Sequence, residues 1–373
     1  MNELKTLPAV FAVGDCYQIM VMAKSEILFG VRVNGTDYFD HSNGIIRSSK
    51  VIHRVCVPMS QLDRAGEYTI FYRKIIERLP YYTTTEPPVE KTIKFYPVPT
   101  NRPINFYHLA DTHGHFTKPA QSAKFFKDEL DVLVLNGDIP DHSGSIENFD
   151  LIYRLCQDIT KGEKPCIFSR GNHDTRGFYA EDIALYTPTD KGDSYFTFRL
   201  GNIWGIVLDC GEDKDDSCDA YGNTVCCHQF RLEQTRFIEN VIKNANTEYL
   251  ADGVQNRIVI VHHPFSYIPK PPFDIEKDIF KNWLTLLEKI KPQLMISGHL
   301  HLTEFSEKGG HLDMLGQVCP VVVGARFEGP NGKRGELTDF IGSAITIDKE
   351  SITVRFTNSE HKVLKTHTIK LND

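Results

Sequence analysis

The first hundred residues contain short runs of apolar and β-branched residues separated by turn signals. The dipeptide Asn34-Gly35 is one such signal, and no amphipathic helical pattern is present in this part of the chain. The pattern predicts a small all-β sandwich of the immunoglobulin or fibronectin type over residues 1–98. A proline-rich stretch at 97–103 then favours an extended connector. The predicted strands cover residues 12–22, 28–33, 51–57, 68–76 and 91–96.

After the connector, short apolar runs alternate with helical patterns. The apolar runs are typical of strands that are buried on both faces. The segments 230–245 and 275–290 place apolar residues on one helical face, and residues 341–371 return to an alternating β pattern. The order predicts an α/β domain over residues 99–373. Its predicted buried strands lie at residues 104–110, 132–135, 166–169, 258–261 and 294–296.

Composition and charge restrict the partners that we expect. The 373 residues carry a formal net charge of -7, and nucleic acid is an unfavourable partner because phosphate-backbone binding needs clustered Lys and Arg. No segment reaches the about 18 consecutive apolar residues of a membrane helix. Nine cysteines are spread over the whole chain. This odd number indicates a reducing compartment, and we therefore expect a cytoplasmic protein.

Five polar blocks directly follow the predicted strands of the second domain. In an open α/β sheet, the residues just past the carboxyl ends of the strands converge on one crevice. Histidine, aspartate and asparagine side chains that are distant in sequence are therefore expected to meet there. The blocks are Asp111-Thr112-His113, Gly137-Asp138-Ile139-Pro140-Asp141, Gly171-Asn172-His173-Asp174, His262-His263-Pro264 and Gly298-His299-Leu300-His301.

The residue types in these blocks suit divalent first-row metal ions, because carboxylates and imidazoles are their usual ligands. A carboxylate shared between two ions holds them about 3.5–4 Å apart. Such a pair lowers the pKa of a bridging water, supplies hydroxide near neutral pH and neutralises charge on a phosphoryl group. Each block alone also fits a surface turn or a polar strand end. Their common position after a strand favours a centre that hydrolyses phosphate esters.

The stretch from Asp111 to His301 matches all five signature blocks of the calcineurin-like metallophosphoesterase superfamily and resembles that superfamily. The resemblance implies a sandwich of two β-sheets flanked by helices. It also implies two divalent metal ions, with Mn, Fe and Zn as candidates. One ion would be bound by Asp111, His113 and His301 and the other by Asn172, His262 and His299, with Asp138 bridging the two.

The same resemblance implies catalytic roles for two more residues. His173 would protonate the leaving oxygen or hold the phosphate. Asp141 would orient His173, since histidine often needs a carboxylate to fix its tautomer, and a solvated turn carboxylate is the alternative. His263 is expected to be a core histidine with satisfied hydrogen bonds. His115 is expected to lie behind the ligands or to face solvent.

Two departures limit the resemblance to particular branches. Ser/Thr protein phosphatases carry a phosphate-holding arginine after the position of Asp141, where this chain has His142. Arg176 is either a partial replacement or an ordinary surface arginine. Purple acid phosphatases also carry an N-terminal β-sandwich, which the first hundred residues resemble. That branch, however, has a metal-binding tyrosine at the position of Asp141, and no purple iron centre is expected.

We therefore expect a metal-dependent phosphomonoesterase or phosphodiesterase that acts on a small or medium phosphate ester. A nuclease of the same superfamily is a second hypothesis. The third is a binding protein with a vestigial site, in which the N-terminal sandwich docks a partner; the complete ligand set argues against it. The polar segment 209–227 between a strand and a helix is expected to border the active-site mouth and to shape substrate choice.

Overall fold

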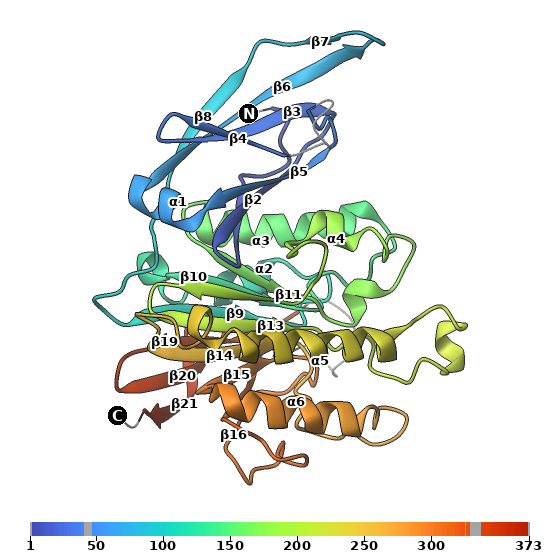
Figure 1. Cartoon of the computed structure of the whole chain (residues 1–373), viewed down its shortest axis with the longest axis vertical. Coiled ribbons are helices and arrows are strands. Elements are labelled where there is room, and N and C mark those ends of the chain that lie inside the picture. Colours follow the sequence, from blue (N-terminus) through green and yellow to red (C-terminus); the bar gives the residue numbers. More distant parts are fainter. Residues whose placement is uncertain (1, 41–46, 325, 329–336, 372–373) are drawn as a thin grey trace.

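A computed structural model of the chain describes residues 2–40, 47–324, 326–328 and 337–371. Two central β-sheets share one hydrophobic core, and helices cover the outer face of each sheet. A third sheet, formed by N-terminal strands, lies at one end of the long axis (Figure 1). This architecture confirms the predicted α/β sandwich of two sheets flanked by helices and preceded by an all-β region.

The larger central sheet has ten strands, and its middle strands run parallel. The strands β9, β10 and β11 are parallel neighbours and are almost completely buried, as the apolar runs predict. In spatial order the strands are β21 (Val363–Lys370), β20 (Ser351–Thr357), β19 (Asp339–Ile347), β9 (Ile104–Leu109), β10 (Val132–Asn136), β11 (Cys166–Ser169), β1 (Ala9–Val13), β2 (Cys16–Met22) and β5 (Ile52–Pro58), and β18 (Arg326–Glu328) pairs with β19.

The smaller central sheet has six strands, of which four neighbours are parallel. Every residue of β13 and of β15 is buried. Parallel strands that are covered on both faces bring their carboxyl ends to one edge of the sheet, where a site can form. In spatial order the strands are β12 (Phe196–Leu200), β13 (Ile203–Leu208), β14 (Asn256–Val261), β15 (Leu294–Ser297), β17 (Val321–Val323) and β16 (Glu304–Ser306).

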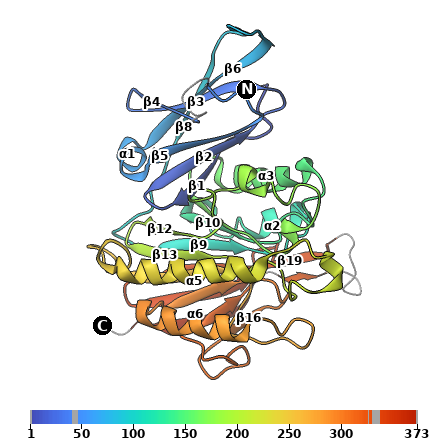
Figure 2. The same ribbon diagram turned by 45° about the vertical axis from the view of Figure 1, so that its right-hand side comes forward.

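Two groups of helices cover the sandwich. One group packs on the ten-stranded sheet and the other on the six-stranded sheet, and Figure 2 shows α5 and α6 on the far side from α3. The two helices predicted from the sequence are α5 and α6, and α3 was not predicted. The helices are α2 (Thr117–Ser122), α3 (Asp150–Thr160) and α4 (Ile183–Tyr186) on the larger sheet and α5 (Cys227–Lys243) and α6 (Lys277–Ile290) on the smaller one.

Most of the remaining N-terminal residues form a five-stranded sheet. The Asn34-Gly35 dipeptide makes the turn between β3 and β4, and both residues have positive φ, as a tight hairpin requires. A short helix, α1, interrupts the strands and was not predicted. The elements are β4 (Thr36–Phe39), β3 (Ile27–Val33), β6 (Glu67–Arg78), β7 (Thr83–Thr85) and β8 (Val89–Lys94), with α1 (Met59–Ala65) between β5 and β6.

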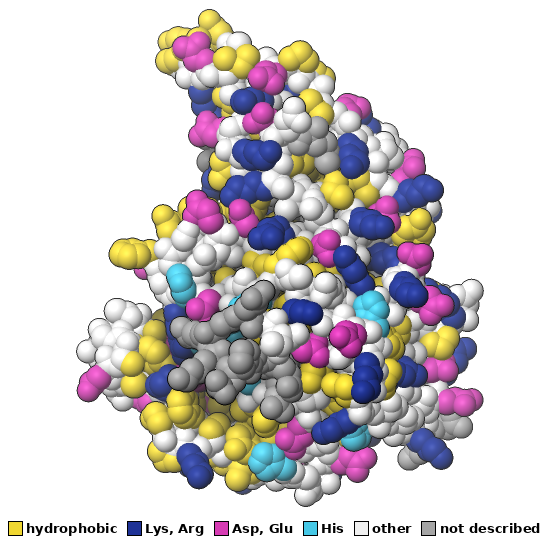
Figure 3. Space-filling model, turned by 180° about the vertical axis from the view of Figure 1, so that it is seen from behind, with side chains coloured by type: hydrophobic (Ala, Val, Ile, Leu, Met, Phe, Trp, Pro, Cys, Tyr) yellow, Lys and Arg dark blue, Asp and Glu magenta, His cyan; other side chains and the backbone are white. Residues whose placement is uncertain are grey.

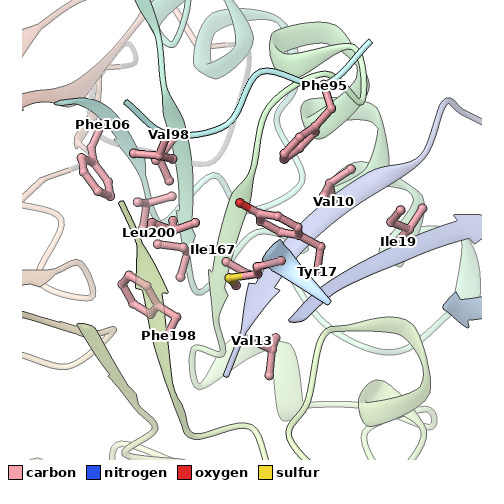
Figure 4. Close-up of a cluster of buried hydrophobic side chains, with 14 of the residues drawn as sticks. Val10, Val13, Tyr17, Ile19, Phe95, Val98, Phe106, Ile167, Phe198 and Leu200 are labelled. Carbon is pink, nitrogen blue, oxygen red and sulfur yellow. The ribbon is translucent and has the colours of Figure 1, made fainter. Parts of the chain in front are cut away.

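Three N-terminal strands belong to the large central sheet. β1 pairs in parallel with β11, and β2 and β5 continue the sheet outward. Residues 12–22 were predicted as one strand, but Gly14, at φ +57°, turns the chain between β1 and β2. Figure 4 shows Val10 and Tyr17 from these strands packed in one cluster with Ile167 and Phe198. The sheet and its core therefore extend across the predicted boundary at residue 98.

None of the helices in the described part of the chain combines the length and the apolar character that crossing a lipid bilayer requires. The cytoplasmic location stays a prediction.

We predict that a chain truncated to residues 99–373 does not fold stably. The truncation removes the parallel partner of β11 and opens the core that β1 and β2 fill, so a large apolar surface would meet water. Circular dichroism during heating, compared with the full-length chain, measures this. A cooperative melt within a few degrees of the full-length protein would show instead that residues 99–373 are an independent unit.

Candidate metal centre

The five polar blocks lie where parallel strands of both central sheets end. Asp111 and Asp138 follow β9 and β10 in the ten-stranded sheet. His262 and His299 follow β14 and β15 in the six-stranded sheet. Because the two sheets stack on a shared core and each presents its carboxyl ends at one edge, the blocks meet at one end of the sandwich.

The first group of potential ligand atoms surrounds Asp111. The His301 Nε2 lies 3.4 Å from the Asp111 Oδ1, and 3.0 Å from the His113 Nε2. One ligand atom from each of these three residues lies within 4.8 Å of the others. A carboxylate oxygen and two imidazole nitrogens at such spacing form a set that a divalent first-row ion accepts.

The second group contains Asp138, His262 and His299, again within 4.8 Å of one another. The His262 Nε2 lies 3.3 Å from the Asp138 Oδ2. Asn172 joins this group because its Oδ1 lies 3.1 Å from the His299 Nδ1. All seven predicted ligands are thus brought together, and that they bind metal stays a prediction.

Asp138 lies between the two groups. It also forms a third group with His113 and His173, so its carboxylate has imidazole neighbours on both sides. Such a position is what the predicted bridging role requires. Burial alone would raise the pKa of Asp138, but the facing His262 and the other imidazoles lower it well below its usual range. The carboxylate is therefore held ionised at neutral pH.

Five of the seven predicted ligands adopt the left-handed backbone region, with φ between 44° and 68°. Non-glycine residues rarely occupy this region, and each such residue costs on the order of 1–3 kcal/mol. Backbone hydrogen bonds between neighbouring blocks hold the conformation; the Asp111 N–H, for example, donates to the Gly137 carbonyl. The five residues are Asp111, His113, Asp138, His299 and His301.

Glycine at position 171 permits the close approach of two blocks. A Cβ there would lie 2.2 Å from the Asp138 Oδ1, which no side chain tolerates without displacing the carboxylate. The backbone N–H of Gly171 donates to the Asp174 Oδ2, and the N–H of Asp138 donates to the same oxygen. Asp174 thus ties the block that holds Asn172 to the block that holds Asp138. No role for Asp174 was predicted from the sequence.

The orientation of His262 is set by the backbone. Its Nδ1 lies 2.7 Å from the Asn136 carbonyl oxygen, which only accepts hydrogen bonds, so Nδ1 carries the proton. Its buried Nε2 has no hydrogen-bond partner in the described part of the chain and faces the carboxylates. Burial lowers the pKa of His262, but Asp138 and Asp111 outweigh it and raise the pKa to about 10. The two carboxylates thus strongly favour a positive charge next to them, either on the protonated His262 ring or on a bound cation.

The carboxylate of Asp141 contacts a different histidine from the one expected. Its Oδ1 lies 3.2 Å from the His113 Nδ1 and 3.9 Å from the His173 Nδ1. The backbone carbonyl of Asp141, at 2.9 Å, is what accepts from the His173 Nδ1. The Asp141 carboxylate thus lies nearer to the predicted ligand His113 than to His173, and its role in orienting His173 stays a prediction. Carboxylates commonly orient metal-binding histidines in this way.

Arg176 lies at the site and is not an ordinary surface arginine. Its Nη1 lies 3.0 Å from the His173 Nε2. Glu212 accepts from the Arg176 Nε at 2.9 Å and from Nη2 at 2.7 Å, and this paired contact fixes the plane of the guanidinium. Glu212 belongs to the segment 209–227, so the prediction that this segment borders the site is confirmed. Glu212 itself was missed, since nothing in the sequence pairs it with Arg176.

The remaining histidines differ in their environments. His263 was expected to have satisfied hydrogen bonds, but its buried Nε2 has no such partner within the described residues. Its ring instead lies against that of His299, with 3.9 Å between centroids. His115 is half-buried next to the first ligand block, in line with a place behind the ligands.

The sequence profile described as calcineurin-like phosphoesterase matches residues 104–302, which is more than half of the chain. The chain belongs to the calcineurin-like phosphoesterase family. This confirms the resemblance drawn from the five blocks and makes the protein a hydrolase of phosphate esters. No curated protein matches the chain significantly.

Two solved structures show that the fold of this phosphoesterase extends beyond the matched residues. A purple acid phosphatase, PPD1, from yellow lupin (Lupinus luteus) seeds aligns at a TM-score of 0.61 and 13% identity, covering 98% of this chain and 74% of that chain. PhoD aligns at a TM-score of 0.51 and 11% identity, covering 98% and 88%. Both alignments include the N-terminal strands, so the similarity of fold covers them as well.

The donor set of this phosphoesterase fits divalent metal ions. The ligand groups contain carboxylate and imidazole donors and no thiolate, which suits divalent first-row ions rather than soft ones. The His262 Nε2 lies 3.3 Å from the Asp138 Oδ2 and 3.7 Å from the Asp111 Oδ1, so a nitrogen donor and two buried carboxylates meet at one place. The family and this geometry together imply divalent metal ions.

We predict that Asp138→Asn and His299→Ala each lower the number of bound metal ions per chain. Removing a charge or an imidazole from the second group leaves too few donors for one ion. Inductively coupled plasma mass spectrometry of protein dialysed against Mn²⁺ or Zn²⁺ gives the stoichiometry. His311→Ala is the control, because His311 is exposed and pairs with Glu304 outside the centre. Unchanged stoichiometry in both site variants would contradict the ligand assignment.

We predict that Gly171→Ala weakens metal binding on the order of tenfold, because the new Cβ displaces the Asp138 carboxylate. Isothermal titration with Mn²⁺ measures the affinity. Gly222→Ala is the matched control: it adds a methyl group at a positive φ with no atom within 4 Å, so it perturbs the backbone without touching the centre. Equal affinity in the two variants would show that space at position 171 does not matter.

Proposed function

We propose that the protein hydrolyses phosphate monoesters or diesters of small to medium size at a dinuclear metal centre. The observation that carries this proposal is the position of Asp138, whose carboxylate belongs both to a ligand group with His113 and to a ligand group with His262 and His299. A carboxylate with ligand atoms on both sides is suited to hold two ions at once.

The residues that would hold the first ion are Asp111, His113 and His301, and those for the second are Asn172, His262 and His299, with Asp138 shared. Two divalent ions bound there supply a hydroxide nucleophile near neutral pH and neutralise charge on the phosphoryl group. Mn, Fe and Zn are the candidate metals, because all three accept nitrogen and oxygen ligands.

His173 and Arg176 would act on the substrate directly. The His173 Nδ1 donates to the Asp141 carbonyl, and Nε2 accepts from the Arg176 Nη1, so Nε2 would exchange a proton with the ester oxygen once Arg176 has turned from it to the phosphate. Arg176 approaches this Nε2 and is held by Glu212. Its fixed positive charge supplies an anion-binding group that His142 does not provide, and we assign Arg176 to binding the phosphate.

The surface supports a small ester rather than nucleic acid as the substrate. On the face in Figure 3, Lys and Arg side chains alternate with Asp and Glu and form no continuous basic stripe. The formal net charge of -7 also disfavours a nucleic-acid substrate. Hydrolysis of single-stranded DNA that falls steeply with salt would instead favour a nuclease.

We predict that Asp138→Asn lowers kcat/KM by a hundred- to a thousandfold, on the order of what losing one electrostatic contact to the transition state costs. The measurement is a panel of monoesters and diesters, assayed with Mn²⁺, Fe²⁺ and Zn²⁺, for the wild type, Asp138→Asn and the control His311→Ala. The control is expected to keep full activity. A metal-replete Asp138→Asn variant with wild-type activity would contradict the proposed function.

We predict that Arg176→Met lowers kcat/KM on the order of tenfold to a hundredfold, the equivalent of one charge-assisted hydrogen bond. Metal stoichiometry is expected to stay at the wild-type value, since the side-chain hydrogen bonds of Arg176 within the described residues go to His173, Glu212 and Asp213 and not to a predicted ligand. Arg236→Met is the matched control, because Arg236 is exposed on α5. If both variants retain wild-type kcat/KM, Arg176 does not bind substrate.

A further inference from the structure

A pocket lies beside the metal centre, at the carboxyl ends of β13, β14 and β15. It is open to solvent on one side, and we call it the side pocket. The predicted ligand His299 forms part of its wall together with His263. Since His299 belongs to both the wall and the ligand groups, the side pocket adjoins the metal centre.

Most of the wall of the side pocket is apolar and rigid. Phe265 and Phe280 form its buried side, and their ring centroids lie 5.7 Å apart. Phe265 also packs edge-on against the buried Trp283 on α6, so its position is fixed by the core. Ile275 lines the pocket, and Phe273, which is 37% exposed, lies at its mouth. Such a surface gains free energy by enclosing an apolar group.

The two acidic residues of the side pocket are already neutralised by other side chains. Glu212 accepts two hydrogen bonds from Arg176. The Asp213 Oδ1 accepts from Lys214 at 2.6 Å, from Tyr221 at 3.0 Å and from Arg176 at 3.2 Å. Lys214 in turn lies 4.9 Å from the centre of the Phe273 ring. With both carboxylates paired, the pocket has no net negative charge to attract a cationic group.

The loop wall of the side pocket is tied to α5. The fully buried Arg231 donates from Nε to the Cys210 carbonyl at 2.8 Å and from Nη2 to the Glu212 carbonyl at 2.6 Å. It also donates from Nη1 to Glu276, which directly precedes α6. Both ends of the wall are therefore anchored to helices, and the pocket is formed before a ligand arrives.

We propose that the side pocket binds an apolar organic group of the substrate, such as an aromatic ring or a short branched alkyl chain, next to the phosphate. This proposal rests on the proposed function, because it names the class of ester that the same centre takes. A sugar or nucleoside in this pocket would place hydroxyl groups against Phe265, Ile275 and Phe280, where they lose their hydrogen bonds to water. Esters of aryl or alkyl alcohols avoid that penalty.

The test compares two phosphonates that differ only in the apolar group and that are not hydrolysed. Calorimetric titration of the metal-loaded protein with phenylphosphonate and with methylphosphonate gives two dissociation constants. We expect phenylphosphonate to bind on the order of thirtyfold more tightly, as the added apolar surface predicts. In the variant Phe273→Ser/Ile275→Ser, the ratio is expected to fall below about threefold, while methylphosphonate affinity stays at the wild-type value and shows that the centre is intact.

Leu250→Ser is the control, because Leu250 is an exposed apolar residue that does not line the side pocket; it is expected to keep the wild-type ratio. A ratio near one in the wild type overturns the proposal, as does an unchanged ratio in the double variant. The binding readout separates this proposal from the proposed function. If esters are not hydrolysed but phenylphosphonate still binds more tightly, the proposed function fails and the pocket assignment stands. If esters are hydrolysed but the ratio of dissociation constants is near one, the proposed function stands and the pocket assignment fails.

Discussion

Two buried carboxylates that face the same imidazole are the constraint on which the site depends. Asp111 and Asp138 are 0% and 1% exposed, and both lie within 4 Å of the His262 Nε2. Taking like charges out of water into one place is costly unless positive charge compensates them. Protonated imidazoles or divalent cations can supply that positive charge. The geometry of the blocks, their strained backbone and the close approach at Gly171 all serve to keep these carboxylates together.

The N-terminal strands stabilise the sheet whose strand ends carry the site, although they do not contribute predicted ligands. β11, which precedes the block with Asn172, pairs on its outer edge with β1. The core that underlies the site continues without interruption from Phe106 and Phe198 to the N-terminal residues Val10 and Tyr17 (Figure 4). Strain stored in the ligand loops has to be balanced by packing elsewhere, and this enlarged sheet and core provide such packing. The N-terminal strands β1, β2 and β5 thus belong to the central sheet that carries part of the site.

The sequence predicted those features that depend on local patterns. The five blocks could be found because each is a short polar signature directly after an apolar run, and parallel topology then brings the strand ends together. Helices α5 and α6 were visible for a similar reason, since one apolar face repeats along each of them. The turn at Asn34-Gly35 follows from residues that tolerate positive φ.

Other features depend on contacts between distant residues and could not be predicted. The pairing of β1 with β11 joins residues about 155 positions apart. The fully apolar run Ala9–Val13 is typical of a strand buried on both faces, but it does not indicate the partner strand. The Asp141 carboxylate lies nearer to His113 than to His173, and no sequence spacing reveals this. Arg176 is bound to the site through Glu212, 36 residues away, and that partnership has no sequence signature.

Anomalous diffraction can show whether the Asp138 carboxylate bridges two metal ions, as we propose. Crystals of the wild-type protein grown with Mn²⁺ would be measured at an energy where manganese scatters anomalously. We expect two peaks about 3.5–4 Å apart, on either side of the Asp138 carboxylate. A single peak, or two peaks too far apart to share that carboxylate, would contradict it.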